Sequence, residues 1–223
     1  MEFALLIGII VAGVGVIWYL ASWFESQRAQ EYAGVARKLG LEFSPAGDNA
    51  LLESLGGFSL FQLGHARKLQ NLIRGQTQQV DVAMFDYRYT TGGGNSSSTS
   101  RQTVIRFESP LLDLPKFELR PAHVGFRLAK LFGYREISFP DNPSFSKKYL
   151  LRGDDEEAVR GAFTEEVMLA LESLAGLHVF GEGAMLLVYR PNKRLRGYEL
   201  RGFLEEAFGV YSQFKIANRT EVP

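Results

Sequence analysis

Residues 3–24 read FALLIGIIVAGVGVIWYLASWF, an apolar run without one charged residue. At ~1.5 Å of rise per residue, a helix over this run covers roughly 33 Å, about the thickness of the hydrocarbon core of a bilayer. The run therefore predicts a single N-terminal transmembrane helix. It divides the chain into an anchor (1–24), a juxtamembrane helix (25–40) and a soluble domain (41–223).

The flanks of the run indicate an anchor that is kept rather than a signal peptide that is cleaved. A signal peptide opens with basic residues and ends at small ones, whereas this segment opens with Glu2 and ends with the bulky pair Trp23–Phe24. Basic residues follow the run, at Arg28, Arg37 and Lys38. Because basic residues stay on the cytoplasmic side, we expect the anchor in the cell (inner) membrane and the soluble domain in the cytoplasm.

Small residues recur every four positions in the run, at Ala4, Gly8 and Ala12. On a helix they form one stripe, the kind of surface along which two transmembrane helices approach closely. The stripe is a candidate helix-pairing face, and we expect a homo-oligomer or another protein as the partner.

The composition excludes several functional classes. The chain carries 25 Lys and Arg against 25 Asp and Glu, so it lacks the basic excess of a protein that binds nucleic acid in bulk, and no nucleic acid partner is expected. It has no Cys, which excludes disulfides, thiolate metal sites and a cysteine nucleophile. The 17 Phe and 9 Tyr are enough for a substantial core.

Residues 58–120 follow the two-residue period of strands. Strands are expected at 69–74, 79–90, 101–107 and 116–120, with Phe58, Leu60 and Leu63 opening the sheet. The segment Val80–Tyr89 carries apolar residues first on one face and then on the other, which predicts a strand that is covered on both sides or bent at a bulge. Residues 91–100, rich in Gly and Ser, predict a mobile hairpin tip.

Helical patterns flank this region and dominate the C-terminal half. Expected helices cover 50–55 with Asn49 as the cap, 124–133, and 198–211, while 145–152 is expected to be extended and 177–190 to form a hairpin. Asp154 and Glu157 resemble a capping box for one helix, and Thr164 offers an alternative second start. The fold class predicted is α+β, with a largely antiparallel sheet, packed helices, and 122–144 as the place where two subdomains would divide.

One part of the chain resembles a family of uncharacterised bacterial proteins that have a single N-terminal transmembrane helix. The matching residues are Phe145, Tyr149, Asp155, Arg160 and Thr164 before an apolar helix. A second match joins 85–89, the Gly/Ser tip, 102–104 and 114–117, and the two together cover most of 79–189. The chain departs from the family at Glu165, where the family usually has Pro. The resemblance implies a bacterial source and a membrane tether, but no activity.

No motif for catalysis, a cofactor or a metal stands out. The histidines His65, His123 and His178 are scattered and have no second ligand at helical spacing. The chain has no G-x-S-x-G elbow and no phosphate-binding loop. We therefore expect no catalytic, cofactor or metal site.

Two charged groups remain as candidates. Asp86, Arg88 and Arg106 share the polar face of the long hairpin, and Asp86 would pair with Arg106 if the register placed them opposite each other. The segment 190–201 is strongly basic, and these residues are candidate contacts with a membrane surface or a partner: Arg190, Lys193, Arg194, Arg196 and Arg201.

These observations favour a non-enzymatic, membrane-tethered interaction or assembly module. One alternative is a peripheral module that binds anionic lipid through 190–201. The other is an enzyme whose site is assembled from distant residues.

Overall fold

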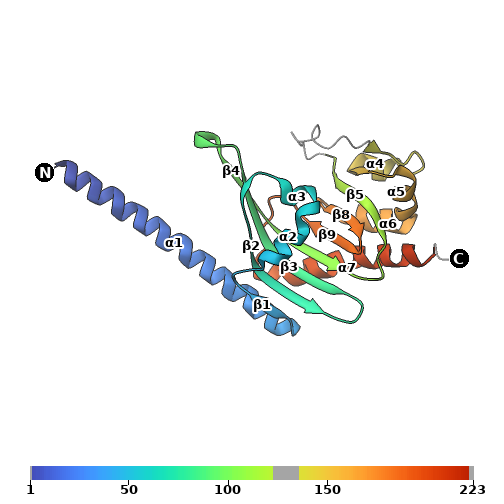
Figure 1. The fold of residues 1–223 in the computed structure, drawn as a ribbon, viewed down its shortest axis with the longest axis horizontal. Coiled ribbons are helices and arrows are strands. Elements are labelled where there is room, and N and C mark those ends of the chain that lie inside the picture. Colours follow the sequence, from blue (N-terminus) through green and yellow to red (C-terminus); the bar gives the residue numbers. More distant parts are fainter. Residues whose placement is uncertain (1, 123–135, 221–223) are drawn as a thin grey trace.

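The computed structural model describes residues 2–122 and 136–220, and for residues 2–12, 14, 95 and 216–220 it describes the backbone alone. Its architecture confirms the α+β class (Figure 1). One antiparallel sheet has the strand order β1-β2-β3-β4-β9-β8-β5-β7-β6. The strands are β1 (Glu42–Ser44), β2 (His65–Gln76), β3 (Asp81–Thr91), β4 (Ser98–Glu108), β5 (Leu114–Pro121), β6 (Glu136–Ile137), β7 (Tyr149–Gly153), β8 (His178–Gly183) and β9 (Met185–Tyr189).

Seven α-helices accompany the sheet in the described ranges. They are α1 (Glu2–Leu39), α2 (Asn49–Ser54), α3 (Ser59–Gln62), α4 (Pro143–Lys148), α5 (Glu156–Ala162), α6 (Glu165–Glu172) and α7 (Gly197–Thr220), with short 3₁₀ turns at Leu55–Gly57 and Gly94–Ser96.

The first helix joins the expected anchor and the juxtamembrane segment without a break. Helix α1 has 38 residues and ends at Leu39, and the next residue, Gly40, has a φ of 68° that suits glycine at a helix end. Its C-terminal part packs on the sheet and on α7, while its N-terminal part stands away from the body (Figure 1). Among the described residues, no helix has the length and apolarity needed to cross a membrane.

Both faces of the sheet are covered. On one face a large core joins the sheet to α1, α7 and the helices α4, α5 and α6. On the other face a smaller core packs α2 and α3 against β2, β3, β4, β8 and β9. In β3, Met84 belongs to the first core, whereas Phe85 and Tyr87 belong to the second. The prediction that Val80–Tyr89 is covered on both sides is therefore confirmed.

Local predictions in the first half differ from the structure at two points. The cap of α2 is Asp48 rather than Asn49, because the Asp48 carboxylate accepts a bond of 3.1 Å from the backbone N–H of Leu51. The segment 58–63 does not open the sheet. It forms α3, whose buried Leu60 and Phe61 cover the second face, since apolar residues at a two-residue spacing also fit one short helical turn.

In the second half, the segment 145–152 is not extended throughout. Residues up to Lys148 form α4, which Asn142 caps, and only Tyr149 onward forms β7. The alternative of two helices is confirmed, but the cap of α5 is Asp155 rather than the predicted Asp154, because the Asp155 carboxylate accepts from the backbone N–H of Ala158. The Thr164 hydroxyl accepts a bond of 3.4 Å from the backbone N–H of Val167 at the start of α6. The expected hairpin over 177–190 is present as β8 and β9.

Two predictions fall on residues outside the described ranges. The helix expected over 124–133 is one, and most of the proposed division at 122–144 is the other. The last helix is longer than expected, because α7 continues to Thr220.

Candidate functional site

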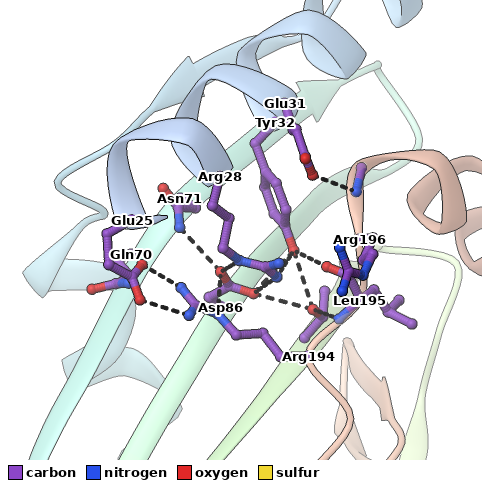
Figure 2. Close-up of polar contacts among 12 residues, drawn as sticks. Glu25, Arg28, Glu31, Tyr32, Gln70, Asn71, Asp86, Arg194, Leu195 and Arg196 are labelled. Carbon is purple, nitrogen blue, oxygen red and sulfur yellow. Dashed lines mark hydrogen bonds and ion pairs between the residues drawn. The ribbon is translucent and has the colours of Figure 1, made fainter. Parts of the chain in front are cut away.

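A buried carboxylate lies at the centre of the described polar contacts between α1 and the sheet. Asp86 follows Val82 and Met84 on the face of β3 that α1 covers, and it is only 3% exposed. A charge at such a position is costly unless other groups solvate it. The surrounding side chains do so (Figure 2).

Helix α1 supplies the strongest of these contacts. Arg28 donates to both Asp86 oxygens, from Nε at 2.6 Å and from Nη2 at 2.8 Å, which is the bidentate geometry that a guanidinium offers a carboxylate. One turn later Tyr32, which is fully buried, accepts from Arg28 at 2.7 Å and donates to Asp86 at 3.0 Å. The four-residue spacing places Arg28 and Tyr32 on the same helix face.

The sheet supplies the neutral donors. Asn71 on β2 donates to Asp86 at 3.0 Å, and Thr103 on β4, directly opposite Asp86, donates at 3.1 Å. The Thr103 hydroxyl also accepts a bond of 2.9 Å from the backbone N–H of Leu195. The carboxylate thus joins three strands to the helix.

The segment before α7 completes the cluster. Arg194 donates from Nε to Asp86 at 3.0 Å and from Nη1 to Glu25 at 2.7 Å, and Gln70 donates to Glu25 at 3.0 Å. Nearby, the Glu31 carboxylate accepts a bond of 3.1 Å from the backbone N–H of Gly197 (Figure 2). We call Glu25, Arg28, Tyr32, Asn71, Asp86, Thr103 and Arg194 the Asp86 cluster.

The electrostatics of the cluster keep the carboxylate charged. Burial by itself would raise the pKa of Asp86, but the hydrogen bonds and charge of Arg28, followed by the charge of Arg194, outweigh burial and leave the pKa below its ordinary value. The hydrogen bond from Arg194 likewise lowers the pKa of Glu25. Burial, reinforced by the Asp86 charge, raises the pKa of Tyr32, so its hydroxyl stays protonated.

This arrangement fastens segments together and occupies both oxygens of Asp86. Six donor contacts surround the two oxygens of Asp86, whereas a carboxylate offers about four lone-pair directions. A substrate proton has no open position on this carboxylate. The geometry fits a structural lock between α1, the sheet and the segment 190–197.

Most of the basic candidates of 190–201 face acids. Arg190 pairs with Glu206 at 2.8 Å, Lys193 with Glu199 at 3.2 Å, and Arg201 with Glu205 at 2.9 Å. Arg194 belongs to the Asp86 cluster, and Arg196 is exposed. Of these five residues, the structure therefore places only Arg194 in the Asp86 cluster.

The proposed pairing of Asp86 with Arg106 does not occur. The register places Asp86 opposite Thr103 and Arg106 opposite Ala83. Arg106 instead forms ion pairs with Asp81 and Glu108 at the far end of the hairpin. The shared polar face was predicted from alternation alone, which does not specify the register between two strands.

Among the described residues, the candidate histidines His65 and His178 are not part of the Asp86 cluster. The side chains of Ala4, Gly8 and Ala12, and all of His123, lie outside the described residues. His65 is exposed, and His178 is buried with its Nδ1 at 3.0 Å from the Tyr189 hydroxyl. Among the described residues, no group of three potential ligands is placed to hold a metal ion.

A hollow of about 200 Å³ lies between α3 and the strands β5, β7 and β8. Burial raises the pKa of Glu118 in its wall, although nearby arginines and the Ser59 hydroxyl oppose this effect. Lys116 and Arg152 also line it. None of the lining residues that the structure describes is a histidine, so the hollow lacks the commonest general base.

The Asp86 cluster was missed in the sequence, although one signal was present. Asp86 is in phase with Val82 and Met84, and a charge in phase with buried residues calls for a buried partner. The partners themselves gave no such signal, because Arg28 and Arg194 lie 58 and 108 residues away in the chain.

No protein-family model matches the chain, and no curated protein matches it. Among solved structures it is similar to the mycobacterial trehalose monomycolate transport factor A, TtfA. The TM-score is 0.61 at 14% identity, over 88% of this chain and 97% of that one. A likeness at this identity shows the fold alone. The arrangement of sheet and helices therefore has a counterpart in a known structure.

Proposed function

We propose that this chain is a single-pass bacterial inner-membrane protein whose cytoplasmic domain is a non-enzymatic interaction or assembly module. The observation that carries the proposal is the change along α1. Its N-terminal part is apolar and stands free, while the Asp86 cluster locks its next turns onto the sheet.

The free part of α1 exposes large apolar side chains to solvent. Trp18 is 73% exposed, Tyr19 66% and Phe24 62%, and Val16, Ile17 and Leu20 are exposed beside them. A patch of this kind marks a contact with a membrane or a protein. The aromatic residues lie at the end of the run, where side chains of this type favour the headgroup level of a bilayer.

The lock begins where the apolar run ends. Glu25 directly follows Phe24, and it belongs to the Asp86 cluster. Because α1 is continuous through this point, a domain fastened at Glu25, Arg28 and Tyr32 would keep a set distance and angle to the membrane. A domain held in this way suits a partner that also lies at the membrane.

The resemblance to bacterial membrane-anchored proteins supports the tether, and the similar solved structure suggests one form that the module takes. That protein is described as a transport factor for trehalose monomycolate. We infer a role beside a membrane transport system as the specific version to test.

The orientation is tested with reporter enzymes fused to the C-terminus. We expect activity from a reporter that works only in the cytoplasm and none from one that works only outside. The reverse result would overturn the cytoplasmic assignment, and recovery of the chain in the soluble fraction would overturn the tether.

Self-association is tested with single cysteines, because the natural chain has none. Ala12→Cys lies on the small-residue stripe, and Ile10→Cys, two positions away, lies on the opposite side of the helix. Oxidation in native membranes should crosslink Ala12→Cys more than Ile10→Cys if the chain pairs with itself. If neither crosslinks, chemical crosslinking should recover a partner in constant ratio, and a monomer without one would contradict the module.

A further inference from the structure

Three basic residues form a row across adjacent strands of the sheet. Lys68 on β2 lies opposite Arg88 on β3, and Arg88 lies opposite Arg101 on β4. All three are exposed, and among the described residues none forms an ion pair. Like charges directly opposite each other destabilise a sheet, so the row does not contribute to the stability of the fold and calls for a functional explanation.

The row borders a hollow of about 190 Å³, which it shares with Glu25, Gln70 and Arg194. The acids at this hollow are already matched: Asp86 and Glu25 face Arg28 and Arg194, two charges against two. The three positive charges of the row are therefore not balanced by the acids at this hollow. The hollow is positive, and its size suits a small anionic group.

The position of the row is as informative as its charge. Arg88 lies on the same face of β3 as Asp86, two residues further toward the hairpin tip, and the hollow reaches Glu25, the residue after Phe24. In Figure 1 the β3–β4 hairpin extends toward the same side as the free part of α1. The hollow thus lies where the apolar part of α1 gives way to the polar domain.

We propose that Lys68, Arg88 and Arg101 bind the phosphate of an anionic phospholipid headgroup next to the anchor. The inference rests on the proposed membrane tether. Each guanidinium can donate two hydrogen bonds to two oxygens of one phosphate, and Lys68 adds a third cation to the two arginines. The lipid contact therefore lies on the sheet rather than on 190–201, where most basic residues already face acids.

The two tryptophans of the chain, Trp18 and Trp23, are natural reporters of the lipids around α1. The full chain is placed in phosphatidylcholine vesicles that contain a minor fraction of phosphatidylglycerol. In one preparation the phosphatidylglycerol carries bromine on its acyl chains, and in a second preparation the phosphatidylcholine does. Bromine quenches indole fluorescence on contact. We expect phosphatidylglycerol to be enriched around the tryptophans about fivefold over its bulk fraction, the factor that one basic contact provides at a membrane surface.

The matched variants each remove two exposed charges. Arg88→Gln with Arg101→Gln should return the quenching to the bulk fraction, while Lys147→Gln with Lys148→Gln, on α4, should keep the enrichment. The first pair should fold, because it relieves like-charge contacts, and circular dichroism checks this. Loss of enrichment in both pairs would show general charge attraction and overturn the site.

The remaining outcomes separate this inference from the tether. Quenching in bulk proportion for the natural chain would overturn the headgroup site and leave the tether standing, whereas no quenching by either lipid would overturn the tether. Enrichment that persists in inorganic phosphate at matched ionic strength supports the lipid. Enrichment that phosphate abolishes and chloride does not would identify free phosphate as the ligand and overturn the lipid.

Discussion

At the scale of single residues, Asp86 shows how the protein keeps a charge in its interior. Removing a carboxylate from water costs several kcal/mol in real proteins. The charges of Arg28 and Arg194 offset part of this cost. Hydrogen bonds from Tyr32, Asn71 and Thr103 offset more of it. The balance depends on every partner, because a guanidinium left without its carboxylate would itself be a partly buried charge.

Asp86→Asn should lower the free energy of unfolding by about 3–5 kcal/mol, since it leaves Arg28 and Arg194 without their shared counter-charge. Urea unfolding followed by circular dichroism measures the change. The control is the exposed Asp113→Asn, which should stay within about 0.5 kcal/mol of the natural chain. Equal effects from the two variants would mean that the cluster adds nothing to stability.

His178 predicts a dependence of stability on pH. Burial, together with the Arg120 charge, lowers the pKa of His178 from 6.5 to about 3. Between these values the unfolded chain binds a proton that the folded chain does not, so the free energy of unfolding falls as the pH falls from 6.5 toward 3. In His178→Asn this part of the slope should vanish, as unfolding curves at several pH values would show. If the free energy of unfolding of His178→Asn changed with pH as it does in the natural chain, the dependence would come from carboxylates.

At the scale of elements, Gly209 of α7 and Gly153 of β7 should respond to alanine in opposite directions. Gly209 lies on the exposed side of α7, and a Cβ there meets no atom within 4 Å. Gly153, at the end of β7, would place a Cβ 2.5 Å from the Val159 side chain and 2.9 Å from the Lys116 carbonyl oxygen. The first position has room for a methyl group, and the second does not.

Gly209→Ala should therefore stabilise the protein by about 0.5–1 kcal/mol through helix propensity. Gly153→Ala should destabilise it by about 1–3 kcal/mol through overpacking. Thermal unfolding of both variants beside the natural chain is the measurement. A destabilised Gly209→Ala would contradict the open surroundings of this position.

At the scale of the whole molecule, we expect α1 to act as a rigid arm. The helix runs unbroken from Glu2 to Leu39, and the Asp86 cluster holds it from Glu25 onward (Figure 1). The orientation of the domain relative to the apolar N-terminal part of α1 would then depend on one helix and one cluster.

Inserting a Gly-Ser linker between Phe24 and Glu25 should leave the domain folded but free its orientation. A spin label at Tyr198→Cys, which is 82% exposed, reports its distance to labelled headgroups in vesicles. The distribution of distances should broaden after the insertion. The same linker after Gly93, at the hairpin tip, should leave it unchanged. An equally broad distribution in the natural chain would contradict the rigid arm.

The local elements were largely predictable, because their signals lie within a few residues. The two-residue period found β3 and β4, and the hydroxyl of Thr164 indicated the start of α6. Local signals failed at α3 and α4, where a few apolar residues fit either a strand or one helical turn. The strand β6 was missed because two residues are too few to show a period.

The sequence by itself determined the α+β class, the apolar N-terminal run and the aromatic core, since hydrophobic patterning acts over neighbouring residues. Only the tertiary structure decided the strand order, which seats β5 between β8 and β7, and the register that sets Asp86 opposite Thr103. It alone brought Arg28 and Arg194 to one carboxylate, and Lys68, Arg88 and Arg101 into one row. Such contacts depend on how distant segments pair, and no local period records that choice.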